Sequence, residues 1–261
     1  MLCSDIIKIL EEHSPLEYAS SWDNVGLLIG DKKNPIHKIH IALDATDEVI
    51  EEAIQQNADM LLTHHPLIFQ GMKKVVANDF IGRRIIRLIQ SNINYYAMHT
   101  NFDIKGMADL AIDYLGIEKE DILEITYQSE QNVEGFGRVG HLSKTVSLKE
   151  CCSLVKEKFQ IDSVKVFGDL EKKVNKIAIS PGSGKSMIPH ALEKKADVLI
   201  TGDIDHHDGI DAVARGLSII DAGHYGIEYI FIPYMKKYLE QNLTDNVTVT
   251  CARIQNPFQI I

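Results

Sequence analysis

A repeated segment is the feature of this sequence that most restricts its fold. Residues 38–63 align with residues 176–201 without gaps, at a constant offset of 138. Each copy reads as strand, turn, helix and strand, and two strands joined through a helix normally run parallel with a right-handed crossover. We therefore predict an α/β fold with two related α/β domains that arose by internal duplication. Chance similarity over 26 residues is the alternative. The identical positions include Ile39 and Ile177, Ile41 and Ile179, Ala53 and Ala191, Asp59 and Asp197, and Thr63 and Thr201.

Hydrophobic periodicity locates the elements of both copies and of the segments around them. His99 and His224 also correspond once a gap of 13 residues is allowed. The first copy is expected to form a strand at 39–43, a helix at 47–56 and a strand at 60–63, and the second a strand at 177–180, a helix at 186–195 and a strand at 198–201. Outside the copies we expect an amino-terminal helix at 1–12 capped by Ser4, a helix at 147–159, and strands at 163–167 and 246–251.

The segment between the copies predicts the domain boundary. Residues 128–132 are polar and resemble a linker, and a new strand-like segment follows at 135–142. We therefore expect a boundary near residue 127, with domains 1–127 and 128–261. The last strand could return to the first domain.

Charge and composition restrict the classes of partner. With 261 residues the chain can bury a sizeable core, and its net charge of −10 argues against a general nucleic-acid or anionic-membrane surface. A small anionic ligand held at a local metal site is still compatible with this charge. No stretch approaches the roughly 20 apolar residues of a membrane span. The four cysteines form no Cys-x-x-Cys motif and the start is not that of a signal peptide, so we expect a reduced, cytoplasmic protein.

Three short strings place imidazole and carboxylate groups directly after apolar, β-prone segments. They are residues 63–66, 99–103 and 221–228. Because side chains at the carboxyl ends of parallel strands converge on one crevice, we expect a single metal cluster at the junction of the two domains. Ordinary polar residues at strand ends are the alternative. The candidate ligands are His64, His65, Asp103, His224 and Glu228.

The spacing of these groups suggests how they would bind. Pro66 ends the strand, so the adjacent imidazoles of His64 and His65 can both turn toward the crevice, each serving one of two ions. His224 and Glu228 are four residues apart, which places them on one face of a helical turn. Mixed imidazole and carboxylate ligation suits Zn, Fe, Mn or Ni, without ranking them.

A glycine-rich segment and three further histidines are predicted to lie near this cluster. Residues 180–186 invite comparison with a P-loop, but the first glycine that such a loop needs is Ile179, so we expect a tight glycine turn whose N–H groups could meet an anionic group. His99, His206 and His207 are candidates for proton transfer or substrate contact. Ligation by His206 and His207, or simple packing at the domain junction, is left open.

Six strings of the sequence match a known family, at residues 22–27, 64–69, 99–103, 182–184, 201–207 and 221–225. Together they resemble the NGG-interacting-factor-three-like family, whose members are also labelled GTP cyclohydrolase I type 2 homologues. The resemblance implies a dinuclear metal centre between two related α/β domains, commonly in a ring-shaped hexamer. It carries the ligands over to the five candidates named above, with Glu228 bridging both ions. Ile227 departs from the polar residue common at its position, which removes a hydrogen bond to the ligands from that side chain.

These observations favour a metal-dependent hydrolase that uses two divalent transition-metal ions per chain and a metal-activated water. The family label suggests a small, nucleotide-like substrate. A metallochaperone or a regulatory interaction protein without turnover is the alternative.

Overall fold

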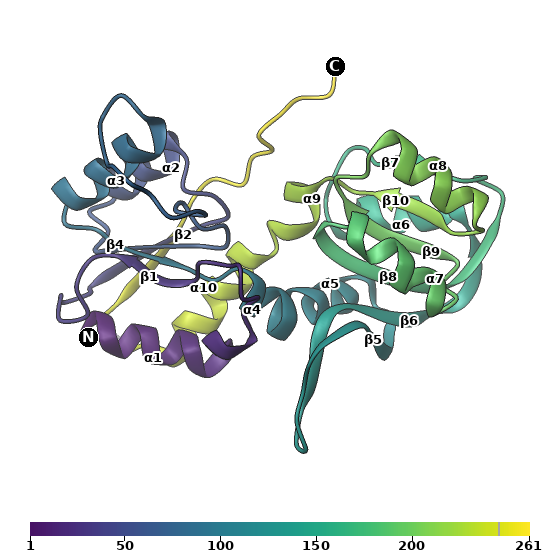
Figure 1. Cartoon of the computed structure of the whole chain (residues 1–261), viewed down its shortest axis with the longest axis horizontal. Helices are drawn as coiled ribbons and strands as arrows, with labels where there is room; N and C mark the ends of the chain where they lie inside the picture. Colours follow the sequence, from purple (N-terminus) through teal and green to yellow (C-terminus); the bar gives the residue numbers. More distant parts are fainter. Residues whose placement is uncertain (245) are drawn as a thin grey trace. The chain divides into compact units, whose positions relative to one another are not determined.

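The computed structural model describes residues 1–244 and 246–261, and it forms two compact units (Figure 1). The first unit comprises Met1–Phe102 and Phe231–Gln255, and the second comprises Asp103–Ile230 and Asn256–Ile261. Each unit contains its own sheet, so the predicted α/β fold class is confirmed. No helix within the described residues is long and apolar enough to cross a membrane.

The first unit is built around a five-stranded sheet of order β1-β4-β3-β2-β11. Strands β11, β2, β3 and β4 run parallel, whereas β1 is antiparallel to β4. Helices α2 and α3 lie on one side of the sheet, and α1 and α10 lie on the other (Figure 1). Ile50 of α2 and Leu88 of α3 are buried in one core cluster with Leu61 and Tyr95 of the sheet. The elements are α1 Cys3–His13, η1 Leu16–Tyr18, β1 Gly26–Ile29, β2 Lys38–Ala42, α2 Asp47–Gln55, β3 Met60–Thr63, α3 Phe80–Gln90, β4 Asn94–Ala97, α4 Thr100–Phe102, α10 Phe231–Asn242 and β11 Thr248–Cys251.

The second unit is built around a six-stranded sheet of order β5-β6-β8-β9-β10-β7. Strands β8, β9 and β10 are parallel, and the other pairings are antiparallel. Strands β5 and β6 form a long hairpin (Figure 1). The elements are η2 Asp103–Met107, α5 Ala108–Leu115, β5 Glu118–Gln128, β6 Val133–Ser147, α6 Leu148–Lys158, β7 Lys165–Phe167, β8 Lys173–Ser183, η3 Lys185–Met187, α7 Ile188–Glu193, β9 Val198–Gly202, α8 His206–Ala214, β10 Ser218–Asp221 and α9 His224–Glu228.

The two predicted copies share their strand register and their hydrogen bonds. Ile39 pairs with Met60 in the first sheet, and Ile177 pairs with Val198 in the second, so both pairings keep the offset of 138. A carboxylate oxygen of Asp59 accepts from the backbone N–H groups of residues 37 and 38, and one of Asp197 accepts from those of residues 175 and 176. Equivalent bonds at equivalent positions support the internal repeat that the sequence predicts.

Two details of the sequence analysis need correction. The first helix begins at Cys3 with Leu2 at its N-cap, so Ser4 lies inside the helix and does not cap it; instead a carboxylate oxygen of Asp5 accepts from the Leu2 N–H at 2.8 Å. The helix expected at 186–195 is divided into η3 and α7.

The correspondence of His99 with His224 is also displaced by one residue. Met98 N donates to Thr63 O in the first unit, and Ala222 N donates to Thr201 O in the second. Gly223, with φ of +75°, therefore lies at the position equivalent to His99, and His224 follows it as the first residue of α9.

The division between the units lies after Phe102 rather than near residue 127. Residues 118–128 form β5, which pairs along its length with β6, so this segment belongs to the second sheet. At the other end of the chain, β11 pairs with β2, which returns the carboxyl-terminal segment to the first unit. Asp103 is therefore the first residue of the second unit.

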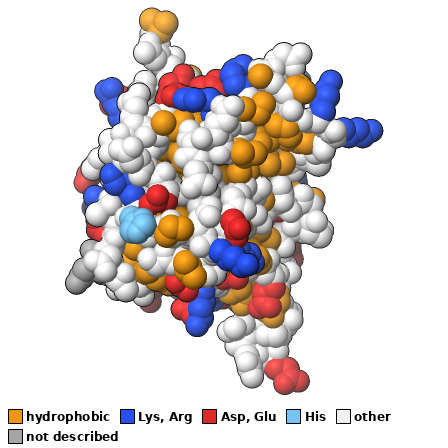
Figure 2. All heavy atoms as spheres, turned by 90° about the vertical axis from the view of Figure 1, so that its left-hand side faces the viewer, with side chains coloured by type: hydrophobic (Ala, Val, Ile, Leu, Met, Phe, Trp, Pro, Cys, Tyr) orange, Lys and Arg blue, Asp and Glu red, His pale blue; other side chains and the backbone are white. Residues whose placement is uncertain are grey.

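An apolar groove of about 530 Å³ lies on the first unit. Ile89 of α3 is 60% exposed there, and Figure 2 shows hydrophobic side chains gathered on the face of the molecule on which this unit lies. The exposed apolar surface of the unit thus follows β1, α3 and the segment between β3 and α3. The groove is lined by residues that include Leu28, Ile29, Ile68, Val75, Ile85 and Ile89.

Candidate metal centre

Three histidines meet at the carboxyl ends of two neighbouring strands of the first unit. His64 and His65 follow β3, and His99 follows β4, whose last residue pairs with the last residue of β3. The ring centroids of His64 and His65 lie 4.8 Å apart, and those of His64 and His99 lie 5.3 Å apart. One ligand atom from each of the three residues lies within 4.8 Å of the others, so this group could hold a metal ion.

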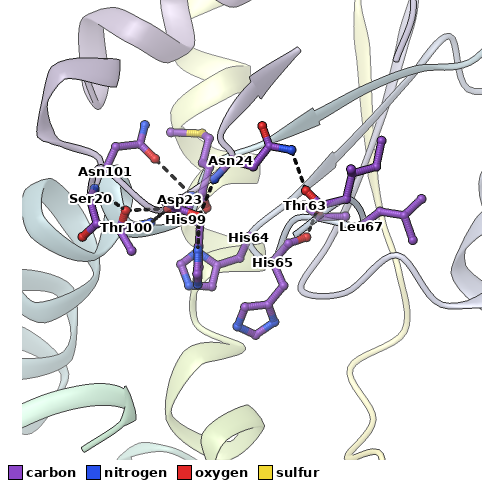
Figure 3. A network of polar contacts seen from close by, with 12 residues as sticks. Ser20, Asp23, Asn24, Thr63, His64, His65, Leu67, His99, Thr100 and Asn101 are labelled. Carbon is purple, nitrogen blue, oxygen red and sulfur yellow. Dashed lines mark hydrogen bonds and ion pairs between the residues drawn. The ribbon is translucent and has the colours of Figure 1, made fainter. Parts of the chain in front are cut away.

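Each of these imidazoles has an oxygen acceptor beside Nδ1. Figure 3 draws the three histidines together with Asp23. His64 Nδ1 lies 2.7 Å from the backbone oxygen of Met98, and His65 Nδ1 lies 2.8 Å from a carboxylate oxygen of Asp44. His99 Nδ1 lies 2.9 Å from a carboxylate oxygen of Asp23. A neutral imidazole that donates from Nδ1 carries its lone pair on Nε2, which is how metal-binding histidines are oriented in proteins.

Asp23 lies at the centre of the polar network in Figure 3. Its side chain is fully buried, and its two carboxylate oxygens accept from His99 and from the backbone N–H and hydroxyl of Thr100. Burial alone would raise the pKa of Asp23, but the hydrogen bonds from His99 and Thr100 outweigh it and lower the pKa to about 2. Asp23 is therefore ionised at neutral pH and holds His99 with a full negative charge.

Tyr95 anchors the segment that carries His65. Its hydroxyl lies 2.7 Å from the hydroxyl of Thr63, donates to the backbone oxygen of His65, and accepts from the backbone N–H of Leu67. Burial raises the pKa of this phenol far above its usual range, so the hydroxyl keeps its proton. The turn after β3 is thus fixed from the sheet side, and Pro66 ends the strand as predicted.

In the second unit, His224 and Glu228 lie one turn apart on α9. His224 Nε2 lies 2.9 Å from Glu228 Oε2, and His224 Nδ1 lies 2.7 Å from Asp203 Oδ2. The side chain of Glu228 is 3% exposed and that of His224 is 34% exposed. A carboxylate oxygen of Asp103 also lies within 4.8 Å of one of Glu228. Three of the predicted ligands are therefore gathered in this unit.

The contacts of His224 fit a cation site. If Nδ1 donates to Asp203, Nε2 is an acceptor that faces the acceptor Oε2 of Glu228 at 2.9 Å. Two acceptors at this separation require a proton or a metal ion between them. Imidazole and carboxylate donors are the ligands that divalent transition metals accept.

The predicted glycine turn seats Glu228. A Cβ at Gly182 would lie 2.4 Å from Glu228 Oε1, and the Gly184 N–H already donates to the backbone oxygen of Gly202. The Glu228 carboxylate therefore fills the space beside Gly182, and the contact of the turn's N–H groups with an anionic substrate group stays a prediction.

His206 and His207 do not join the predicted ligands of the second unit in any group that could hold a metal, among the residues that the structure describes. Both are exposed at the start of α8, with ring centroids 5.1 Å apart. Their predicted role in catalysis stays a prediction, as does that of His99.

Comparison with known proteins identifies the family. A family model described as Duf34/NIF3 (NGG1p interacting factor 3) matches residues 1–257. The chain belongs to the DUF34/NIF3 family. A DUF34/NIF3 relative from Clostridium acetobutylicum, named GTP cyclohydrolase 1 type 2 homolog, is 38% identical over 90% of this chain and 88% of its own length. The family predicted from the sequence is confirmed.

Solved structures agree with this assignment. A Bacillus cereus protein related to NIF3 superposes with a TM-score of 0.94 at 25% identity, covering 100% of this chain and 99% of that one. Staphylococcus aureus hypothetical protein SA1388 gives a TM-score of 0.90 at 31% identity, again covering 100% and 99% of the two chains. The DUF34/NIF3 fold therefore extends over the whole of this chain.

Sequence reasoning missed the three aspartates that orient the imidazoles of this DUF34/NIF3 protein. Asp44 follows β2, so the same strand-end signal could have found it. Asp203 lies at the offset of 138 from His65, so the repeat could have found it too. Asp23 precedes β1, which reaches this edge of the sheet only because it runs antiparallel to β4. No local sequence signal reports that orientation.

Proposed function

We propose that this DUF34/NIF3 protein binds two divalent transition-metal ions per chain, Fe, Zn, Mn or Ni, and hydrolyses a small nucleotide-like substrate. In this proposal His64 and His65 of the first unit act together with Asp103, His224 and Glu228 of the second. Glu228 would be the ligand that the two ions share.

The observation that carries the proposal is the shared orientation of four imidazoles. His64, His65, His99 and His224 each have Nδ1 at 2.7–2.9 Å from an oxygen acceptor, and three of the four acceptors are carboxylates. His13, His40 and His141 also have an oxygen at 2.8–2.9 Å from Nδ1, but it is a hydroxyl or side-chain amide oxygen and not a carboxylate. A histidine that binds a metal through Nε2 needs an acceptor at Nδ1, because the acceptor fixes both the tautomer and the ring orientation.

Divalent ions at such a site supply Lewis acidity to water and to the substrate. The protein's own part is to hold the ligands and to move protons. The Asp23 carboxylate lies 2.9 Å from His99 Nδ1 and orients the ring, and we propose His99 as a group for proton transfer or substrate contact. His206 and His207 are proposed as further groups for proton transfer or substrate contact. The nucleotide-like substrate rests on the names of relatives such as the Clostridium acetobutylicum protein.

Metal analysis combined with an activity screen tests this function. Protein reconstituted separately with Fe, Mn and Zn should hold two ions per chain and hydrolyse a member of a panel of nucleotides, pterins and phosphoesters. His65→Ala should lose metal and turnover together. His37→Ala is the matched control, because the His37 side chain is 68% exposed in the same unit and should be dispensable for both.

The outcomes separate the classes of function. Metal content near zero after reconstitution would remove the metal centre. Two ions with every coordination position filled by protein, and no turnover in the screen, would favour storage or a regulatory interaction. The ring-shaped hexamer is part of the proposal as well, and light scattering of the purified protein measures it directly.

A further inference from the structure

We infer that Arg138 is a positioning residue for Asp103, acting through the π-helical turn η2. Asp103 is the first residue of this turn, and a turn of this kind is an irregular way to carry a ligand. Short π-helical turns are rare and frequently occur at functional sites. The contacts that hold this turn from outside therefore bear on the position of Asp103.

The guanidinium of Arg138 supplies such contacts. Arg138 is fully buried, and its Nη2 donates to the backbone oxygen of Ile104 at 3.0 Å, one residue after Asp103. Nε and Nη2 form a two-pronged ion pair with the carboxylate of Asp109 in α5, with both distances at 2.7 Å. One side chain of β6 thus forms hydrogen bonds both to the turn η2 and to the helix α5 that follows it.

The donors of Arg138 are fully used. Nη1 donates to the backbone oxygens of Gly135 and Gly137 at 2.8 and 2.9 Å. With the three bonds to Ile104 and Asp109, these account for all five N–H groups of the guanidinium. Lysine offers three donors from a single point and cannot reproduce this fork.

Burial of the guanidinium favours a positional role over a purely stabilising one. Removing a charged group from water is costly, and a well-packed apolar side chain of similar volume is often as stabilising as a buried ion pair. A second tether, the ion pair between Lys105 and Glu134, joins the same turn to the same strand. Two charged contacts from β6 therefore converge on the turn that begins with Asp103.

This inference rests on the proposed function, in which Asp103 binds one of the ions. Outer partners of metal ligands typically change metal affinity by about 10–100-fold when they are altered. Arg138→Lys should therefore weaken one of the two metal sites by at least about tenfold, and leave the other near its wild-type affinity. Asp109→Asn, a milder change, should act in the same direction if Arg138→Lys folds poorly.

Lys119→Gln is the matched control. Lys119 Nζ lies 2.8 Å from Asp109 Oδ1, so this variant removes a charged partner from the same carboxylate. Its side chain is 47% exposed, and its ion pair is with Asp109 rather than with the turn. Lys119→Gln should bind both ions as the wild type does.

The test is a titration of metal-free protein with Co²⁺, followed by absorption spectroscopy, with hydrogen exchange of residues 103–107 measured in parallel. Arg138→Lys should lose affinity at one site and speed exchange in the turn about tenfold relative to Lys119→Gln. The double variant Asp103→Asn/Arg138→Lys should lose no more affinity than Asp103→Asn alone, because Arg138 acts through Asp103. A purely structural role would instead weaken both sites or give additive losses.

Three results would overturn the inference: wild-type Co²⁺ binding in folded Arg138→Lys, additive losses in the double variant, or no Co²⁺ binding by the wild type. The last would also remove the metal centre. Two bound ions without turnover, together with the expected losses, would reject hydrolysis while upholding the role of Arg138.

Discussion

Gly182 lies against the carboxylate of Glu228, so that a Cβ at position 182 would come within 2.4 Å of Glu228 Oε1. The backbone of Gly182 has φ of +77°, a conformation that side-chain-bearing residues rarely adopt. The other oxygen of Glu228 is 2.9 Å from His224 Nε2, and the side chain is 3% exposed. Glu228 therefore cannot move away from a larger residue at 182 without leaving His224.

Gly182→Ala should lower the free energy of unfolding by about 1–3 kcal/mol and weaken metal binding by at least about tenfold. The stability loss comes from the strained backbone and the clash, and the affinity loss comes from the displaced carboxylate. Gly116→Ala controls for strain, because Gly116 has φ of +64° with nothing within 4 Å of its Cβ position. Urea unfolding of metal-free protein and Co²⁺ titration measure the two effects. Equal behaviour of the two variants would show that Gly182 does not seat Glu228.

Asp23→Asn should lower the free energy of unfolding of metal-free protein by about 2 kcal/mol at neutral pH. The buried carboxylate accepts hydrogen bonds from His99 and Thr100, and bonds to a charged group contribute about 1.5–3 kcal/mol each, offset in part by the bonds that asparagine keeps. Urea unfolding at pH 7 in the presence of chelator measures this loss. A variant as stable as the wild type would show that the negative charge of Asp23 does not stabilise the folded protein.

The difference in unfolding free energy between the wild type and Asp23→Asn should also depend on pH, in a direction that the pKa of Asp23 determines. The pKa of Asp23 is lowered to about 2 in the folded state, against about 3.9 for an unfolded aspartate. A depressed folded pKa adds stability that is present above the unfolded pKa and is lost as the pH falls through the folded pKa. The stability difference between wild type and Asp23→Asn should therefore shrink as the pH falls from about 4 to 2. A difference that stays constant over this range would contradict the lowered pKa.

Chelation should lower the thermal midpoint of the wild type, because a ligand that binds only the folded form stabilises it by mass action. The effect is about 2.7 kcal/mol when the free ligand is at 100 times its dissociation constant. Glu228→Ala should be largely insensitive to chelator, since the residue proposed to bridge the ions is gone. Calorimetry with and without chelator, after metal removal has been verified, measures the midpoints. An unchanged wild-type midpoint would argue that metal does not bind preferentially to the folded protein.

The sequence could predict the site residues that directly follow parallel strands. The strand Met60–Thr63 has the predicted bounds, and the two histidines that follow it lie together with His99 as the strand-end argument requires. His224 and Glu228 lie on one helical turn, as their spacing predicts. Periodicity and chain order carry this information, because parallel strands bring their carboxyl ends to one edge.

Pairings between distant segments could not be predicted in this way. Asp23 meets His99 across 76 positions in sequence, through an antiparallel strand that no local pattern distinguishes from a parallel one. Arg138 of β6 meets Ile104 of η2 across 34 positions in sequence. The polar residues at 128–132, predicted as a domain linker, instead connect the two strands of a hairpin. The boundary near residue 127 failed for the same reason: a turn and a linker have similar composition.

His206→Ala and His207→Ala should each keep the metal content of the wild type while lowering turnover by about 10²–10⁴-fold, the scale of a lost proton-transfer group. Both side chains are exposed at the start of α8, so each change should shift the free energy of unfolding by no more than about 0.5 kcal/mol. His65→Ala should lose metal and turnover together, because His65 is proposed as a ligand. Metal analysis and initial rates on the same preparations separate these cases. A fall in metal content in either α8 variant would make that histidine a ligand, and unchanged turnover in both would show that the predicted catalytic role is wrong.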